Sequence, residues 1–180
     1  MALRIVAADD SYLVREALRH LLQSSPEIEV VALCGDGGLS MLMGELLTAA
    51  GLDIPVKLMV FNNSTLGMVR AEMMVVGYQP WGTDVKNPDF GAVASAIGLH
   101  GERVENAADI RPAIERAFAH PGPALIDFVT DPRALAVPPH TTIEEVKGFA
   151  LTTGKLVFGG DFAEAWGQAK SNIRDMGQAL

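Results

Sequence analysis

The sequence predicts an α/β protein with three layers, in which helices cover both faces of a mainly parallel sheet. Segments of strand length alternate along the chain with segments of helical periodicity, the pattern typical of parallel sheets. Of the 180 residues, 49% are hydrophobic, enough to bury a sizeable core. No internal repeat or long linker interrupts the pattern. The length therefore fits one domain, or one domain with a small appendage.

The first third of the chain predicts a β-α-β unit followed by a turn and a helix. Apolar residues recur on one helical face between Ser11 and Ser24, and the Ser24-Ser25-Pro26 sequence ends that helix. The expected elements are a buried strand over 3–8, the helix over 11–24, a strand over 29–34, a turn over 35–38 and a helix over 39–50.

The remaining residues continue the alternation and then become helical. An irregular loop is expected around Pro80, Trp81 and Gly82. The expected elements are strands over 56–61, 101–104 and 124–129, and helices over 65–76, 90–97, 107–119, 143–157 and 162–176.

Composition excludes several functional classes. The net charge of -8 argues against a nucleic-acid partner, which needs clustered Lys and Arg. The single cysteine, Cys34, excludes an internal disulfide framework and suits a reducing compartment. No signal peptide and no membrane-spanning apolar run are recognised, so we expect a cytoplasmic protein without a membrane partner.

Chemistry concentrates where two neighbouring strands are expected to end. The turn Gly35-Asp36-Gly37-Gly38 lies between a strand and a helix start, where glycine permits close approach of a ligand. Free N–H groups at the start of a helix favour an anion such as diphosphate. Asp36 cannot bind that anion directly, but its carboxylate is suited to hold a cation that bridges to it.

The next strand ends in Asn62-Asn63, and parallel strands bring their carboxyl ends to one edge of the sheet. Asp36 and Asn63 are therefore expected to meet there. Carboxylate, amide and carbonyl oxygens suit Mg²⁺, which also favours phosphate partners. The Gly-Asp-Gly-Gly sequence alone fits an ordinary tight strand-to-helix turn better than a binding site. Its combination with an Asn-Asn pair at the next strand end is more specific.

These motifs resemble the thiamine diphosphate signature. The segments GDGGLSMLMGELLT, PVKLMVFNNSTLGMV, GPALIDFVTDP and PPHTTIEEVKGFAL resemble the C-terminal domain of pyruvate dehydrogenase (quinone) and pyruvate oxidase, and more distantly acetolactate synthases. The resemblance covers about residues 30–180. It implies thiamine diphosphate and Mg²⁺ as cofactors.

The resemblance also assigns site residues. It implies that the side chains of Asp36 and Asn63 bind Mg²⁺, with the carbonyl of Thr65 as a third ligand. It implies no catalytic side chain in this chain. The cofactor-binding residues that it implies are Gly35, Asp36, Gly37, Gly38, Asn63, Leu66, Gly67 and Met68.

The N-terminal segment departs from that family. Where the family carries a glycine-rich turn with a supporting Met, this sequence has Ala8-Asp9-Asp10-Ser11-Tyr12. Residues 1–34 instead resemble the opening β-α-β segment of a LuxR-type response-regulator receiver domain. We therefore expect a chimera, with residues 1–34 integrated into the sheet and residues 35–180 forming the thiamine diphosphate domain. Asp9 and Asp10 are expected to weaken diphosphate binding by like-charge repulsion, unless a metal lies between them.

Three functions follow from these resemblances. The first is a thiamine diphosphate- and Mg²⁺-binding domain of an enzyme that decarboxylates pyruvate or another 2-keto acid. No pyrimidine domain is recognised, so this chain alone is expected to be inactive, and to self-associate through its cofactor-side face. The second is a receiver-type signalling module, although the third strand ends in Asn62-Asn63 and lacks the phosphoacceptor Asp. The third is a structural chimera without ligand function.

Overall fold

A computed structural model describes residues 5–7, 31–134, 143–160 and 162–176. By their contacts, the chain divides into two compact units. The first unit comprises Met1–Ser64 and Lys86–Thr130, and the second comprises Thr65–Val85 and Asp131–Leu180. The helix expected over 11–24, the acidic pair Asp9-Asp10 and the start of the strand expected over 29–34 lie outside the described residues.

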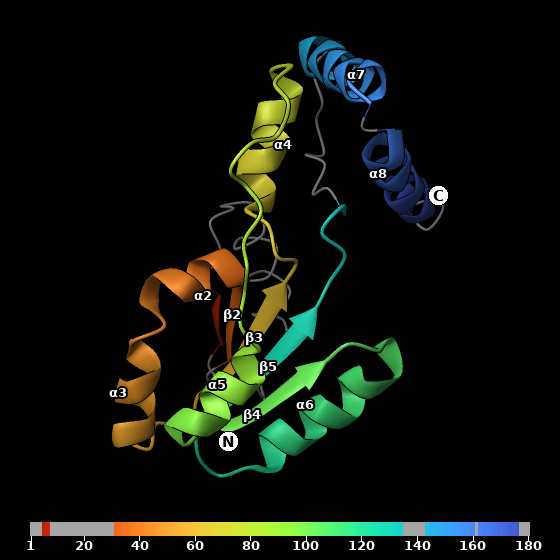
Figure 1. Cartoon of the computed structure of the whole chain (residues 1–180). Coiled ribbons are helices and arrows are strands. Elements are labelled where there is room, and N and C mark those ends of the chain that lie inside the picture. The colour runs from red at the N-terminus through yellow and green to blue at the C-terminus, as the bar shows by residue number, and fades with distance from the viewer. Residues whose placement is uncertain (1–4, 8–30, 135–142, 161, 177–180) are drawn as a thin grey trace. The chain divides into compact units, whose positions relative to one another are not determined.

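A five-stranded parallel sheet forms the centre of the first unit (Figure 1). The strand order is β1-β2-β3-β5-β4, so β5 lies between β3 and β4. Parallel neighbours require crossover connections, which the helices supply. The strands are β1 (Ile5–Ala7), β2 (Val31–Gly35), β3 (Lys57–Asn62), β4 (His100–Val104) and β5 (Ala124–Val129).

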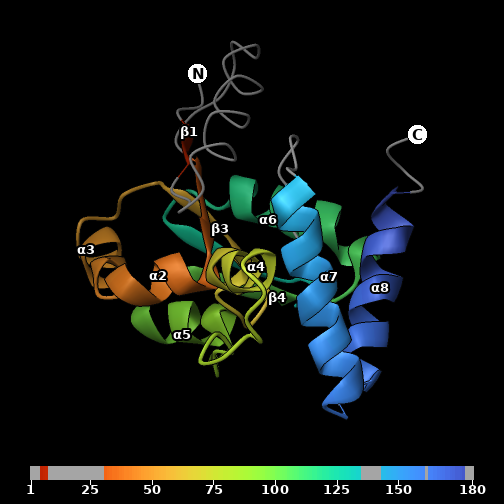
Figure 2. The same ribbon diagram turned by 90° about the horizontal axis from the view of Figure 1, so that it is seen from above.

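Helices cover both faces of this sheet, which confirms the predicted α/β/α fold class. Figure 2 shows α5 and α6 on opposite sides of the strands. The described helices of this unit are α2 (Asp36–Leu42), α3 (Glu45–Gly51), α5 (Phe90–Ile97), η1 (Ala107–Asp109) and α6 (Ile110–Ala119).

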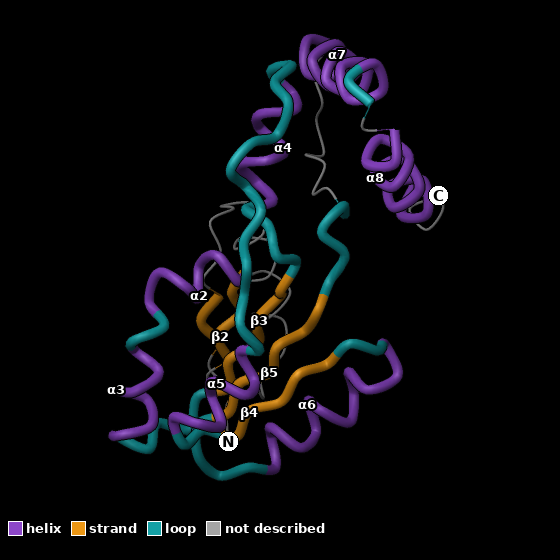
Figure 3. The backbone as a smooth tube through the Cα atoms, in the orientation of Figure 1, coloured by secondary structure: helices purple, strands orange, loops and turns teal. Residues whose placement is uncertain are grey.

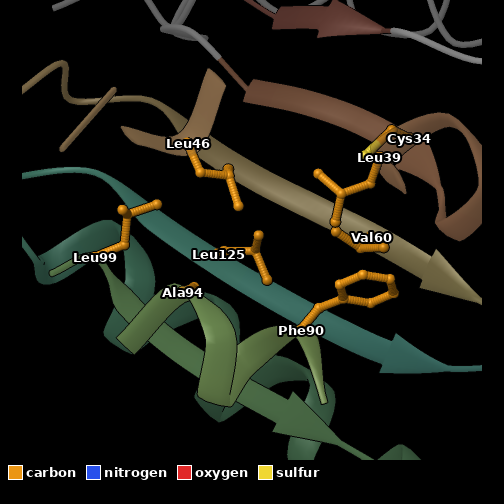
Figure 4. Packing of buried hydrophobic residues seen from close by; sticks show 8 residues of the cluster. All are labelled: Cys34, Leu39, Leu46, Val60, Phe90, Ala94, Leu99 and Leu125. Carbon is orange, nitrogen blue, oxygen red and sulfur yellow. The ribbon is translucent and has the colours of Figure 1, made fainter. Parts of the chain in front are cut away.

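Side-chain alternation along β5 divides the core into two layers. Leu125 packs into the layer beneath α2, α3 and α5, which Figure 4 shows from close by. Its neighbours Ala124 and Ile126 point to the opposite face and pack against Ala113 and Ala117 of α6. Burial of each large apolar side chain contributes about 1.5–3 kcal/mol. Successive residues of β5 thus serve different layers, as the period-two geometry of a strand requires.

Two glycines allow α5 to lie directly on β4. A Cβ atom on Gly101 would lie 2.0 Å from the carbonyl oxygen of Gly91, and one on Gly91 would lie 2.5 Å from the carbonyl carbon of Glu102. Neither distance is compatible with a side chain. Asp89 fixes the start of α5 by accepting a hydrogen bond from the N–H of Ala92 at 2.8 Å. The helix is thereby held against the edge strand.

Most expected elements are confirmed, with three corrections in the first unit. The turn expected over 35–38 is wrong beyond Gly35, because Asp36, Gly37 and Gly38 already belong to α2. The helix expected over 39–50 is wrong as a single element, because hydrogen bonding changes to the i→i−3 pattern at Met43 and Gly44 and separates α2 from α3. The helix expected over 107–119 begins instead as the 3₁₀ turn η1. The elements expected over 90–97, 124–129 and 162–176 have the predicted bounds. Figure 3 labels them α5, β5 and α8.

The second unit is helical. Its described elements are α4 (Gly67–Val75), α7 (Ile143–Phe158) and α8 (Phe162–Met176). Helices α4 and α7 meet closely at Gly148, where a Cβ atom would lie 1.7 Å from the carbonyl oxygen of Val75. The hydroxyl of Thr152 donates to the carbonyl of Met74 at 2.9 Å. None of the described helices is both long enough and apolar enough to cross a membrane.

Candidate functional site

The predicted strand-end residues of the first unit lie at one edge of the sheet. Strands β2 and β3 pair in parallel with Gly35 opposite Phe61. Asp36 therefore begins α2 beside the end of β3, where Asn62 is the last strand residue and Asn63 follows directly. Asp36 and Asn62 are buried, and Asn63 is half-buried. The topology thus brings Asp36 and the Asn-Asn pair to the same carboxyl edge.

The polar residues of this edge continue an apolar layer of the core. On β3 and β5, a buried apolar residue is followed two positions later, on the same face, by a buried polar one. At the end of β2 the buried polar residue is the first residue of α2. The pairs are Cys34 and Asp36, Val60 and Asn62, and Leu125 and Asp127. Cys34 is buried in the hydrophobic core. The layer beneath α5 therefore changes from apolar to polar as it approaches the edge.

Five side chains at this edge form one continuous chain of hydrogen bonds, which we call the amide–carboxylate network. They are Asp36, Asn87, Asn62, Asp127 and Arg103. The Asn87 amide group donates to the carboxylate of Asp36 and, at 2.9 Å, to the amide oxygen of Asn62. Asn62 in turn donates to Asp127 Oδ1 at 3.0 Å. Arg103 Nη1 donates to Asp127 Oδ2 at 2.8 Å. All five residues belong to the first unit.

The two carboxylates determine which way the two amides face. An ionised carboxylate only accepts hydrogen bonds, so Asn62 must present its NH₂ group to Asp127. The oxygen of Asn62 then faces Asn87, which must present its own NH₂ group to both Asn62 and Asp36. Each amide orientation follows from its neighbour, so none is arbitrary. Donation therefore runs outward from Asn87, to Asp36 on one side and through Asn62 to Asp127 on the other.

Asp127 fixes the inner end of the network. Its side chain is fully buried, and Oδ2 also accepts a hydrogen bond from the N–H of Phe90 at 3.2 Å. A buried carboxylate is tolerated only when charge and donors compensate it. Hydrogen bonding to Glu105, with the charge of Asp127, raises the pKa of Arg103 above its ordinary value. Arg103 therefore stays cationic, and Asp127 has a permanent partner.

The glycine turn has open space beside it. Within the part of the chain that the structure describes, a Cβ atom added to Gly35 or Gly38 would meet no atom within 4 Å. Gly35 has φ -77° and ψ 163°, so its backbone is one that any residue adopts. The expectation that glycine is needed there for a tight turn is therefore wrong for Gly35. Free space for a ligand remains a reason for glycine at this position.

The other predicted site residues belong to the second unit. Thr65 is buried, and its hydroxyl donates to the carbonyl of Thr83 at 3.1 Å. Leu66 precedes α4, and Gly67 and Met68 open that helix. Their roles beside the cofactor, and that of the Thr65 carbonyl as a metal ligand, stay predictions.

Sequence reasoning missed Asn87, Asp127 and Arg103. Asn87 and Asp127 lie 25 and 65 positions from Asn62 along the chain. A signal for Asp127 was present, because it is the one charged residue within the buried strand ALIDFV. A carboxylate in a buried strand needs hydrogen-bond donors, and polar residues at the ends of the neighbouring strands can supply them. Asn87 lacks a comparable signal, because it lies in an ordinary polar loop.

The donors at this edge suit a hard divalent cation. They are carboxylate and amide oxygens, and among the described residues no group of three or more His, Cys, Asp or Glu side chains is arranged to hold a metal ion. Magnesium sites commonly use one or two carboxylates together with phosphate oxygens. The Oδ1 atom of Asn87 is buried and has no hydrogen-bond partner within the described part of the chain. An unpaired buried oxygen is unfavourable, so a polar ligand at this edge is expected.

Comparison with known families gives one family model that covers more than half of the chain. The model of the thiamine pyrophosphate enzyme, C-terminal TPP binding domain, matches residues 17–128. That match includes all five residues of the amide–carboxylate network. It begins inside the segment that resembles a receiver domain, so the receiver-like origin of residues 1–34 stays a prediction.

Individual relatives agree with this match. The chain is 34% identical over 127 residues to YdaP of Bacillus subtilis (strain 168), named as a thiamine pyrophosphate-containing protein, covering 71% of this chain and 22% of that protein. It is 34% identical over 116 residues to the mitochondrial acetolactate synthase catalytic subunit of Aspergillus candidus, covering 64% of this chain and 17% of the subunit.

A solved structure supports the fold. The thiamine diphosphate-dependent 4-hydroxybenzoylformate decarboxylase of Rhodococcus jostii RHA1 matches with a TM-score of 0.54 and 34% identity. The match covers 61% of this chain and 21% of the decarboxylase. This chain thus spans about a fifth of the length of the proteins that it matches.

Proposed function

Because this chain belongs to the thiamine pyrophosphate enzymes, through their C-terminal TPP binding domain, we propose that it binds thiamine diphosphate together with Mg²⁺. The observation that carries the proposal is the convergence of Asp36 and the Asn-Asn pair at one edge of the parallel sheet. Ligands of open α/β sheets bind at this edge.

Asp36 and Asn63 supply the side-chain oxygens for the ion. Asp36 carries a negative charge that Mg²⁺ favours, and Asn63 adds a neutral amide oxygen that does not repel the diphosphate. The resemblance adds the carbonyl of Thr65 as a third ligand. A site with one carboxylate keeps the charge balance favourable when an anionic diphosphate occupies the other coordination positions. The protein therefore binds the anion through the cation.

The open space beside Gly35 and Gly38 supports a place for the diphosphate. A side chain there would occupy space that backbone N–H groups need for close approach to an anion. The resemblance puts Gly37 and Gly38 against the diphosphate, and Leu66, Gly67 and Met68 beside the thiazolium half of the cofactor. These contacts belong to the proposal.

The printed names of the relatives support a proposal for the substrate class. When bound, thiamine diphosphate stabilises the carbanion left by decarboxylation of a 2-keto acid. We propose a 2-keto acid, with pyruvate as the first candidate, for the complete activity to which this domain contributes. The role of this chain is to hold the diphosphate and its cation.

Isothermal titration calorimetry of the full 180-residue chain with thiamine diphosphate tests the proposal. We expect binding with Mg²⁺ present, loss of binding with EDTA, and loss of binding in Asp36→Ala. Asp109→Ala is the matched control, because Asp109 is exposed on η1 and does not belong to the amide–carboxylate network. Tight binding with EDTA present, or unchanged binding in Asp36→Ala, would contradict the assigned ligands.

A further inference from the structure

The first asparagine of the Asn62-Asn63 pair has a different task from the second. Asn62 is 2% exposed, and its two amide atoms are already engaged, with Asp127 on one side and Asn87 on the other. A side chain with both ends occupied by protein partners is not available as a ligand. Its location, beside a residue assigned to the metal, needs a separate explanation.

Asn87 has the contacts that link this asparagine to Asp36. Its NH₂ group is shared between the Asp36 carboxylate, through Oδ2, and the oxygen of Asn62. A carboxylate held through one oxygen presents the other in a fixed direction. Hydrogen bonding to a metal-binding carboxylate also sets its orientation, and residues that do so tune metal affinity.

We propose that Asn87 and Asn62 are positioning residues that hold the Asp36 carboxylate in the orientation needed for a divalent cation, with Asp127 and Arg103 as the anchor. This inference rests on the proposed function, since it assumes that Asp36 binds the ion. It assigns two tasks to the Asn-Asn pair: Asn63 binds the cation, and Asn62 transmits the fixed position of Asp127 to Asp36 through Asn87.

The arrangement makes the network rigid for physical reasons. Asp127 is in the interior strand β5, where Arg103 lies directly opposite it on β4. Asn62 is in β3, hydrogen-bonded to β5 through its backbone as well, since the Thr130 N–H donates to the Asn62 carbonyl at 2.9 Å. Only Asn87 comes from a loop, and it lies two residues before Asp89, which caps the start of α5. Short side chains on fixed backbone lose little entropy on forming the network.

Manganese binding to the full chain, in the presence of thiamine diphosphate, tests this inference. Free Mn²⁺ is quantified by electron paramagnetic resonance at a temperature where circular dichroism shows every variant folded. We expect Asn87→Ala to weaken Mn²⁺ affinity by roughly tenfold or more, as loss of an outer hydrogen-bond partner does. Asn87→Gln, which retains a donor, should recover part of the affinity. Asn106→Ala, an exposed asparagine of the same unit, should bind as the unaltered chain does.

A double-mutant cycle with Asn62→Ala adds a second readout. If both residues act through one path, the double variant should weaken Mn²⁺ binding little more than the stronger single variant does. A merely structural role would leave the Mn²⁺ affinity of folded Asn87→Ala unchanged, and that result would overturn the inference. Failure of the proposed function gives a different result: the unaltered chain and Asp36→Ala would then bind Mn²⁺ equally well or not at all.

Discussion

The two units of this protein hold charged groups away from water in different ways. In the first unit, the fully buried carboxylate of Asp127 is held by Arg103, by an amide and by a backbone N–H. In the second, Arg70 and Arg133 both bind Glu164, whose side chain is 30% exposed. We call Arg70, Arg133, Glu164 and Asp84 the Glu164 cluster. It lines a pocket of about 440 Å³ together with Pro80, Pro132 and Leu156.

The amide–carboxylate network and the Glu164 cluster are stabilised by side chains of different length and flexibility. The amide–carboxylate network uses mainly short side chains on strands, so its geometry follows from the backbone. The Glu164 cluster uses long side chains on helices and loops, which lose more rotamer entropy when fixed. It also keeps a second carboxylate, Asp84, at 3.5 Å from Arg70 Nη1. Losing one partner should therefore be more costly in the first unit than in the second.

The largest effect is expected for Asp127→Ala. It removes the acceptor of Arg103, Asn62 and Phe90 together, and breaking a buried charged pair from one side costs about 3–5 kcal/mol. Urea-induced unfolding measures the loss in the free energy of unfolding, and hydrogen exchange of β3 and β5 amides locates it in the first unit. Asp109→Ala serves as the control. A loss below about 1 kcal/mol for Asp127→Ala would remove the contrast between the units.

Glu164→Ala should have the next largest effect, confined to the second unit. The side chain of Arg70 is 10% exposed. In this variant it would lose its ion pair with Glu164 and keep the longer contact with Asp84. Loss of a hydrogen bond to a charged group costs about 1.5–3 kcal/mol. Faster hydrogen exchange in α4, with unchanged exchange in β5, is the expected pattern. Equal acceleration in both elements would show that the units do not respond separately.

Arg133→Ala tests the more exposed member of the same cluster. Its side chain is 42% exposed and lies 3.2 Å from Glu164, so the ion pair should contribute at most about 1 kcal/mol. We expect a small decrease in thermal unfolding temperature, less than that of Glu164→Ala. A larger decrease than Glu164→Ala would mean that packing of the arginine stem on Gly167 outweighs the charge.

A surface pair of the first unit gives the smallest effect, and a pH dependence. The hydrogen bond from Arg116 lowers the pKa of Glu102 below its ordinary value of 4.5. Because the folded-state pKa is depressed, this pair stabilises the protein above pH 4.5. That stabilisation is lost as the pH falls below 4.5 through the depressed value. In Arg116→Ala, the free energy of unfolding should decrease less between neutral and acidic pH than it does in the unaltered chain. Urea unfolding at several pH values measures this difference. An unchanged curve would contradict the assignment.

The sequence predicts the fold better than it predicts the network. Alternation and glycine turns identify β5 and α5 with their observed bounds, because these elements depend on local periodicity. The break at Gly44 depends on how α2 and α3 lie on the sheet, and a helical pattern alone does not show it. Asp36 and Asn63 are identified by motif spacing. Asn87 cannot be identified from the sequence, because it lies 51 positions from Asp36 and only folding brings the two side chains into contact.

One structural experiment addresses the central claim most directly: a crystal structure of the full chain with thiamine diphosphate and Mg²⁺. We predict one metal ion bound by the side chains of Asp36 and Asn63, with the cofactor diphosphate completing its coordination. Asn87 should keep its contacts with Asp36 and Asn62. A metal ion bound elsewhere, or side chains of Asp36 and Asn63 that do not share one ion, would contradict the account.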